Sequence, residues 1–205
     1  QTEADRLLAG ESQLSLGVTL RDGTVFVDRA NLTNPQMVVT AQGSAQNGHQ
    51  NVTLQARVNN LGVILPDFPG ALTVNGTLAQ TAQGTQVDLH ATGPGQIDAQ
   101  IQGRMAPNFR SADMTINGTA LAGLANPFIS PRVVSGRTAF DLRLNGPFQL
   151  ASLSGSVTLA DGRLADPGLM FSLDGMAARA DLAGGQARSA GSGRSGTGGQ
   201  VTLNG

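Results

Sequence analysis

Hydrophobic and polar side chains alternate one by one along much of this chain. In residues 96–105, QIDAQIQGRM, one side of the alternation carries Ile, Ala, Ile, Gly and Met, while the other carries Gln, Asp and Arg. Residues 52–58 (VTLQARV) and 140–144 (FDLRL) divide in the same way, and no charged residue falls on the apolar side of these three segments. Successive side chains of a β-strand point to opposite faces, so this period of two predicts strands with one buried face.

Weaker forms of the same alternation recur along the chain, separated by Gly, Asn and Asp residues. Strands at this density, with turn-forming residues between them, predict an all-β protein with antiparallel pairing. A helical pattern is confined to short turns at residues 2–9 and 120–126. The further predicted strands cover residues 12–20, 24–32, 36–45, 71–79, 86–92, 110–120, 152–160, 169–174 and 201–204.

The Asn-Gly dipeptides leave two interpretations open. Asn-Gly between two alternating runs usually marks a hairpin turn. Here the alternation runs through the dipeptide, since Leu72, Val74, Gly76 and Leu78 keep one phase. The second interpretation therefore places these glycines inside strands, on the apolar face, where the missing side chain lets another group approach closely. The dipeptides begin at Asn75, Asn117, Asn145 and Asn204.

Residues 183–200, AGGQARSAGSGRSGTGGQ, differ from the rest of the chain in composition. They are rich in Gly and Ser and poor in apolar side chains, a composition typical of flexible linkers. We predict a flexible loop over this segment.

An apolar sheet face needs a cover, and this sequence offers little to provide one. The 205 residues include 7 Phe but no Trp or Tyr, and the helical pattern is short. Burying apolar surface stabilises a protein by about 25 cal/mol per Å², so exposed faces on several strands would be costly. Two structures remain open: a sheet that curls around its own apolar face to form a groove for a greasy ligand, or a second sheet that completes a β-sandwich.

Candidate residues for catalysis or metal binding are few. The net charge is −1 and there is no Cys, so electrostatic binding of nucleic acid, disulfides and thiolate metal sites are not expected. His49 falls in a polar turn, and His90 shares a polar strand face with Asp88, as expected for a solvated surface pair. Residues 191–196 match G-x-G-x-x-G, but no helical pattern follows them. We therefore predict neither an enzyme nor a bound cofactor or metal.

One phrase occurs twice in the chain, as LSLGVTLRDGTV in residues 14–25 and as LSGSVTLADGRL in residues 153–164. The second copy extends into LSGSVTLADGRLADPG, residues 153–168, which resembles the repeats of the TamB family. Residues 118–155, with their Asn-Pro and their closing Leu-x-Gly-Pro, resemble the same family. The resemblance covers residues 10–205 and is closest to the conserved C-terminal region of these inner-membrane-anchored subunits of the translocation and assembly module.

The resemblance implies a fold and a role. TamB-like proteins, within the AsmA-like group, are elongated sheets curled lengthwise into an open apolar groove, called a β-taco. They are implicated in phospholipid transport between inner and outer membranes and, with the outer-membrane barrel protein TamA, in outer-membrane protein assembly. Residues 1–205 would then be a single β-rich fragment of a longer repeat-like groove. Its location would be the periplasm, with an inner-membrane anchor in an N-terminal segment outside this sequence.

We therefore expect phospholipid acyl chains to lie along the inward side chains of the groove. The alternative hypothesis is a chaperone that holds nascent outer-membrane proteins by adding their strands to an exposed sheet edge. The expected lipid-groove residues are Val52, Leu54, Val58, Leu72, Val74, Leu78, Ile97, Ile101, Met105, Met114, Ile116, Phe140, Leu142, Leu144, Leu153, Val157 and Leu159.

Overall fold

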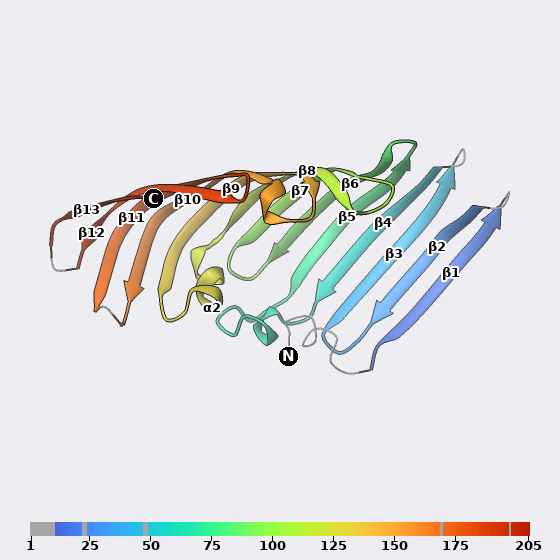
Figure 1. The fold of residues 1–205 in the computed structure, drawn as a ribbon. Coiled ribbons are helices and arrows are strands. Elements are labelled where there is room, and N and C mark those ends of the chain that lie inside the picture. Colours follow the sequence, from blue (N-terminus) through green and yellow to red (C-terminus); the bar gives the residue numbers. More distant parts are fainter. Residues whose placement is uncertain (1–10, 22–23, 47–48, 169, 197) are drawn as a thin grey trace. The chain divides into compact units, whose positions relative to one another are not determined.

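The computed structural model describes residues 11–21, 24–46, 49–168, 170–196 and 198–205. Within these ranges the chain is almost entirely β-structure, and thirteen strands form one antiparallel sheet in which each strand pairs with its neighbours in sequence (Figure 1). This confirms the prediction of an all-β antiparallel fold. The alternative of a β-sandwich is wrong, because the strands join in one sheet rather than two.

The element bounds agree well with the alternating segments. The strands are β1 (Gln13–Arg21), β2 (Thr24–Thr33), β3 (Met37–Gln46), β4 (His49–Val58), β5 (Leu72–Thr81), β6 (Gly84–Gly93), β7 (Ile97–Met105), β8 (Ser111–Leu121), β9 (Val133–Pro147), β10 (Leu153–Asp166), β11 (Phe171–Ala183), β12 (Gln186–Ser195) and β13 (Gln200–Asn204). The short helices are η1 (Leu61–Val63), η2 (Ala122–Ala125), α2 (Asn126–Ile129) and η3 (Leu150–Ser152).

The strands pack into two compact units. The N-terminal unit comprises Gln1–Pro94 and Gln100–Phe109, and the C-terminal unit comprises Gly95–Ala99 and Arg110–Gly205. No feature of the sequence predicted this division.

In the N-terminal unit, the predicted alternation becomes one apolar and one polar sheet face. Exposed and half-buried residues alternate along the whole of β4. Across the strands, Val52 pairs with Leu78 and Val58 pairs with Leu72, so the apolar side chains of β4 and β5 share one face. Side chains directly opposite each other stabilise the pairing through their contact.

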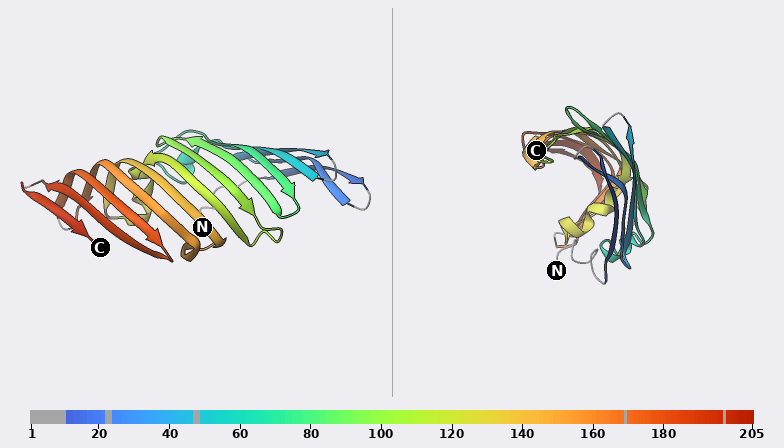
Figure 2. Two further views of the ribbon diagram at one scale, coloured as in Figure 1. Left: turned by 90° about the horizontal axis from the view of Figure 1, so that it is seen from above. Right: turned by 90° about the vertical axis from the view of Figure 1, so that its right-hand side faces the viewer.

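In the C-terminal unit, β9 alternates over all 15 of its residues. Leu142 of β9 pairs with Ile116 of β8 on one side and with Gly155 of β10 on the other. The strands β9–β12 bend along their length, and α2 lies on the inner side of that curve (Figure 2). The curved sheet predicted from the sequence is therefore present in this unit.

The glycines of the Asn-Gly dipeptides lie mainly inside strands. A Cβ added at Gly76 would lie 2.0 Å from the carbonyl oxygen of Asp88, and one at Gly118 would lie 2.2 Å from that of Asp98. The neighbouring backbone therefore occupies the space that a side chain would need. The hairpin interpretation is wrong for β5, β8 and β9, which contain Gly76, Gly118 and Gly146, while Gly205 directly follows β13.

The predicted flexible loop over residues 183–200 is wrong for most of its length, because β12 spans Gln186–Ser195. Its backbone pairs with both β11 and β13, and this pairing requires no large side chains. A Cβ at Gly191 would lie 2.9 Å from the Cβ of Ala178, so this strand needs small residues. The short helix predicted at 120–126 is confirmed by η2 and the start of α2, while the one at 2–9 lies outside the described residues.

Candidate apolar binding site

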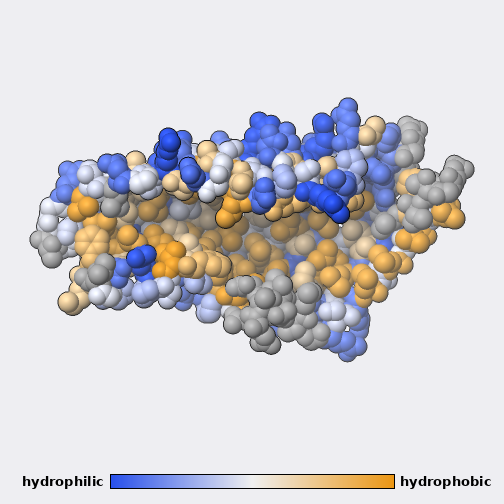
Figure 3. All heavy atoms as spheres, viewed as in Figure 1, coloured by the Kyte–Doolittle hydropathy of each residue, from blue (hydrophilic) through white to orange (hydrophobic). Residues whose placement is uncertain are grey.

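An apolar cavity of about 420 Å³ lies in the C-terminal unit, between the sheet and η2. Figure 3 shows hydrophobic residues gathered in a hollow over the strands of this unit, at the left of the view. The cavity is lined by Ala120, Leu121, Ala122, Leu124, Ala125, Val134, Thr138, Phe140, Val157 and Leu159.

The sheet side of the cavity follows from strand register. Phe140 pairs with Val157 across β9 and β10, and Thr138 pairs with Leu159. On the other side of β9, Thr138 pairs with Ala120 of β8. Directly paired residues share one face of a sheet, so three strands contribute to one apolar wall.

The opposite wall comes from the connection between β8 and β9. The amide of Leu121 donates to the carbonyl oxygen of Gly95 at 2.7 Å, which fixes the start of this connection. Its end is fixed by Asn126, whose Oδ1 accepts a hydrogen bond from the amide of Val134 at 2.8 Å. Between these two points the chain turns through η2, which brings Leu124 and Ala125 to the cavity.

The cavity lining carries one polar side chain, Thr138, and no charged one. The Thr138 hydroxyl donates to the carbonyl oxygen of Ala120 at 2.7 Å, so its hydrogen-bonding capacity is used by the backbone. A wall of this kind cannot donate or abstract protons, but it removes apolar surface from water. The arrangement suits an apolar ligand.

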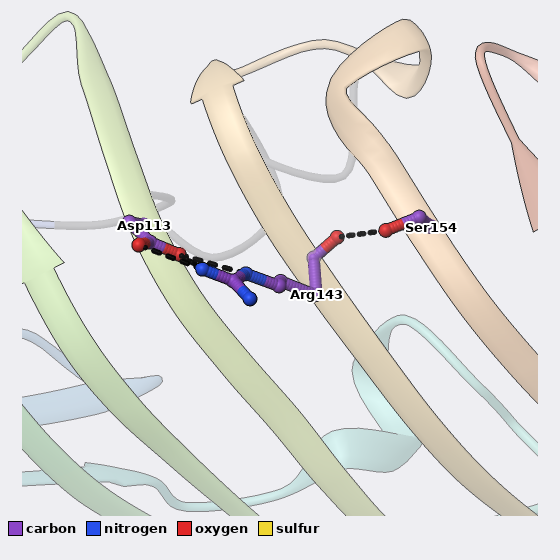
Figure 4. A network of polar contacts seen from close by, with 3 residues as sticks. All are labelled: Asp113, Arg143 and Ser154. Atoms are coloured by element: carbon purple, nitrogen blue, oxygen red, sulfur yellow. Dashed lines mark hydrogen bonds and ion pairs between the residues drawn. The ribbon is translucent and has the colours of Figure 1, made fainter.

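Charged side chains of β8 and β9, among them Asp113, Arg137 and Arg143, lie on the other face of the sheet. The Nε and Nη2 atoms of Arg143 donate to the carboxylate oxygens of Asp113, both at 2.9 Å, and the Ser154 hydroxyl donates to the Arg143 carbonyl oxygen (Figure 4). The hydrogen bond to Asp113 and its negative charge raise the pKa of Arg143 above the ordinary value. Arg137 pairs with Asp161 through a single contact, from Nη2 to one carboxylate oxygen, at 2.6 Å. This separation keeps charge away from the apolar face.

The structure brings together part of the predicted groove. All 17 predicted residues are half-buried except Met114, which is buried. Only Phe140, Val157 and Leu159 line the cavity. In the C-terminal unit the remaining members are Ile97, Met114, Ile116, Leu142, Leu144 and Leu153, and in the N-terminal unit they are Val52, Leu54, Val58, Leu72, Val74, Leu78, Ile101 and Met105.

Several residues that line the cavity were not predicted from the sequence. Val134 carried a usable signal, because it continues the phase of Thr138 and Phe140 towards the start of β9. Leu121 and Leu124 carried none, because a short helical pattern does not reveal which sheet face it will cover.

The polar candidates from the sequence form no reaction centre. Asp88 accepts a hydrogen bond from Gln102 at 3.3 Å and is exposed, as is His90. Among the described residues, no group of three His, Asp or Glu side chains is placed to hold a metal ion. Residues 191–196 lie mostly in β12 rather than in a phosphate-binding loop.

The fold and the cavity define an antiparallel β-sheet protein with an apolar, ligand-sized cavity. Comparison with protein-family models, curated proteins and solved structures finds no match to the chain. Within the described residues, no helix has the length and apolar character needed to cross a membrane.

Proposed function

We propose that this chain binds lipid acyl chains along the apolar face of its sheet, as a segment of a TamB-like periplasmic protein. The observation that carries the proposal is the cavity between the sheet and η2, whose single polar side chain is already hydrogen-bonded. The same apolar face continues beyond the cavity in a row in which Ile116 pairs with Leu142, and Gly155 pairs with both Leu142 and Leu182.

The size and chemistry of the cavity support an acyl ligand. A volume of about 420 Å³ falls in the usual range for small-molecule sites, roughly 300–1,000 Å³. Each methylene removed from water contributes about 0.8 kcal/mol, so part of a fatty acyl chain is enough for stable binding. Methylene contacts are non-directional, so selectivity among acyl chains will be low.

The biological role follows from the resemblance to the TamB family. In this role the chain performs no catalytic step and needs no cofactor. It carries phospholipid between inner and outer membranes, with a TamA-like outer-membrane barrel protein as partner and with outer-membrane protein assembly as the dependent process. The segregation of Arg and Asp pairs to the other sheet face supports the proposal, because an unpaired charge beside acyl chains would be costly to desolvate.

Photo-crosslinking tests the proposal at adjacent positions of β9. Phe140 lines the cavity, whereas Ala139 is exposed and precedes it, so it faces the other side of the sheet. A photo-reactive residue at 140 should capture labelled phospholipid in cells expressing the chain, and one at 139 should not. Equal labelling at both positions, or none at either, would contradict an acyl-binding face.

A second function is favoured by the apolar residues of β1, the first strand in the sheet order. Leu14, Leu16, Val18 and Leu20 alternate along it and remain 58% to 69% exposed. An edge strand with an apolar face is a template for a further strand, as the chaperone hypothesis requires. Leu16→Lys with Val18→Lys should then abolish capture of an unfolded outer-membrane protein and leave lipid labelling at position 140 unchanged.

A further inference from the structure

Large apolar side chains are exposed at one end of the C-terminal unit, the lower end of its strands in Figure 1. Phe128 of α2 is 72% exposed and Met170, in the turn between β10 and β11, is 95% exposed. Val133 and Phe171, at the starts of β9 and β11, are 47% and 38% exposed. We call these four residues the apolar rim.

Strand register places Val133 and Phe171 at the same end of the sheet but on opposite faces, because their partners are consecutive residues of β10. Val133 pairs with Ala165 of β10, and Phe171 pairs with the next residue of β10, Asp166. Two strand spacings of about 4.8 Å each therefore separate the β9 and β11 members. Phe128 joins them because α2 is tied to the start of β9, where the amide of Arg132 donates to the Ile129 carbonyl oxygen at 3.0 Å.

Ion pairs hold the rim and largely cancel its charge. Arg132 pairs with Asp166 at 3.1 Å, and the other carboxylate oxygen of Asp166 accepts the Gly168 amide at 3.0 Å. These contacts fix the turn that carries Met170. Arg163 pairs with Asp174 at 3.1 Å, and Arg194 lies opposite Asp174 in register. The charges of these five described residues, three Arg and two Asp, sum to +1.

We infer that the apolar rim docks the C-terminal unit onto the surface of a phospholipid bilayer. Its side chains project from α2 and from a hairpin turn, so they can enter the interfacial region, where apolar side chains insert by about 5–10 Å. Burying these side chains removes apolar surface from water, which favours the inserted state. One net positive charge complements lipid phosphates without making attraction to anionic lipid the main source of affinity.

The rim residues lie close in the chain to residues that line the cavity. Val134 and Leu124 line the cavity, and each lies within a few residues of a rim residue in the chain. A bilayer at the rim would therefore lie beside the cavity wall. The docking itself does not rest on the proposed function, because it needs no ligand in the cavity.

Vesicle flotation tests the inference with the whole chain and phosphatidylcholine vesicles. The double variant Phe128→Ser with Met170→Ser should partition onto vesicles at least about 10-fold more weakly than wild type, a loss of about 1.4 kcal/mol or more. The matched control is Phe148→Ser with Leu150→Ser, which removes exposed side chains (55% and 77%) at the opposite end of β9. This control should float like wild type.

A fluorescence measurement gives the second readout. The chain has no Cys, so Met170→Cys and Leu150→Cys can each carry one environment-sensitive dye. Addition of phosphatidylcholine vesicles should shift the emission of the dye at position 170 to the blue and leave the dye at position 150 unchanged. Circular dichroism identifies any Ser variant that unfolds. In that case the labelled single-Cys chains decide whether the rim inserts into the bilayer.

Three results would overturn the inference. The first is equal loss of flotation in the rim variant and the opposite-end variant. The second is binding that requires anionic lipid and disappears in high salt, since that would be electrostatic. The third is a blue shift at position 170 that follows protein concentration without vesicles, which would assign the rim to self-association. Val157→Asp, which places a charge in the cavity wall opposite position 140, should abolish lipid labelling by the photo-reactive residue at 140 and leave the position-170 shift intact. Failure of the proposed function therefore remains distinguishable from failure of docking.

Discussion

At Gly155 the space for a side chain is filled by the neighbouring strand. A Cβ there would lie 2.2 Å from the Asp141 carbonyl oxygen and 2.9 Å from the Leu142 Cα, and the φ angle is +119°. Both the clash and the backbone conformation exclude other residues without local rearrangement. Because Leu142 pairs directly with Gly155, the glycine also sets how closely β9 and β10 approach along the apolar face.

Replacing Gly155 tests this role. We expect Gly155→Ala to lower the free energy of unfolding by about 2 kcal/mol or more, measured as a lower urea midpoint. Gly17→Ala is the control, because an added Cβ there meets its nearest atoms at 3.8 Å and φ is outside the left-handed region. The control should change stability by no more than about 0.5 kcal/mol. Similar midpoints for the two variants would show that the close approach at Gly155 is unimportant.

The Arg143–Asp113 ion pair contrasts with Gly155 because it is exposed. The Arg143 side chain is 55% exposed and the Asp113 side chain is 54% exposed. Exposed pairs gain little over water, so Arg143→Ala should shift the urea midpoint far less than Gly155→Ala does. The pKa of Arg143 is raised above its ordinary value, so the contribution of the pair is complete at any pH below that ordinary value and is lost only as pH rises beyond it. Urea midpoints at pH 6 and pH 9 should therefore show the same small effect, and a larger effect at one pH would contradict this.

At the scale of elements, alternation was sufficient to predict strands where large and polar residues take turns, as in β4, β7 and β9. It failed for β12, because a strand made of Gly and Ser shows no apolar period, and its partners β11 and β13 supply the backbone hydrogen bonds. Alternation also left the Asn-Gly dipeptides ambiguous. Only the neighbouring strand shows whether the dipeptide forms a turn or lies inside a strand, where the adjacent backbone approaches the glycine closely.

The connection that covers the cavity depends on Asn126. Its Oδ1 is the acceptor for the Val134 amide, and this contact is partly buried. We expect Asn126→Ala to cost about 1 kcal/mol locally and to raise the hydrogen-exchange rate of the Val134 amide. Asn60→Ala, which removes the acceptor for the amides of Gly62 and Gly70 in the N-terminal unit, should leave that rate unchanged. An unchanged exchange rate in Asn126→Ala would show that this hydrogen bond does not hold the connection that forms the cavity wall.

At the scale of the whole molecule, the predicted groove residues are half-buried or buried in their strands, but the cavity itself was not predictable. Sequence patterns assign a residue to a face, whereas a cavity also needs the position of η2, which depends on contacts with Gly95 and Val134. Among the described residues, burial is concentrated at a few positions such as Leu173 (1% exposed), and most of the apolar face is only half-buried. That face has capacity left for a ligand.

A fatty acid should use that capacity and stabilise the folded chain. A ligand that binds only the native state at about 100 times its Kd adds about 2.7 kcal/mol, which raises the thermal midpoint. Phe140→Asp places a charge in the cavity wall and should remove the shift, while Asp141→Asn, one residue along on the other face, should keep it.

Hydrogen exchange then locates the effect. Added protection should concentrate in β8, β9, β10 and η2, because these elements line the cavity. Protection confined to β4 and β5 would place the ligand on the apolar face of the N-terminal unit instead. A thermal shift that survives Phe140→Asp would mean that the fatty acid binds elsewhere, and the cavity would lose its role as the acyl site.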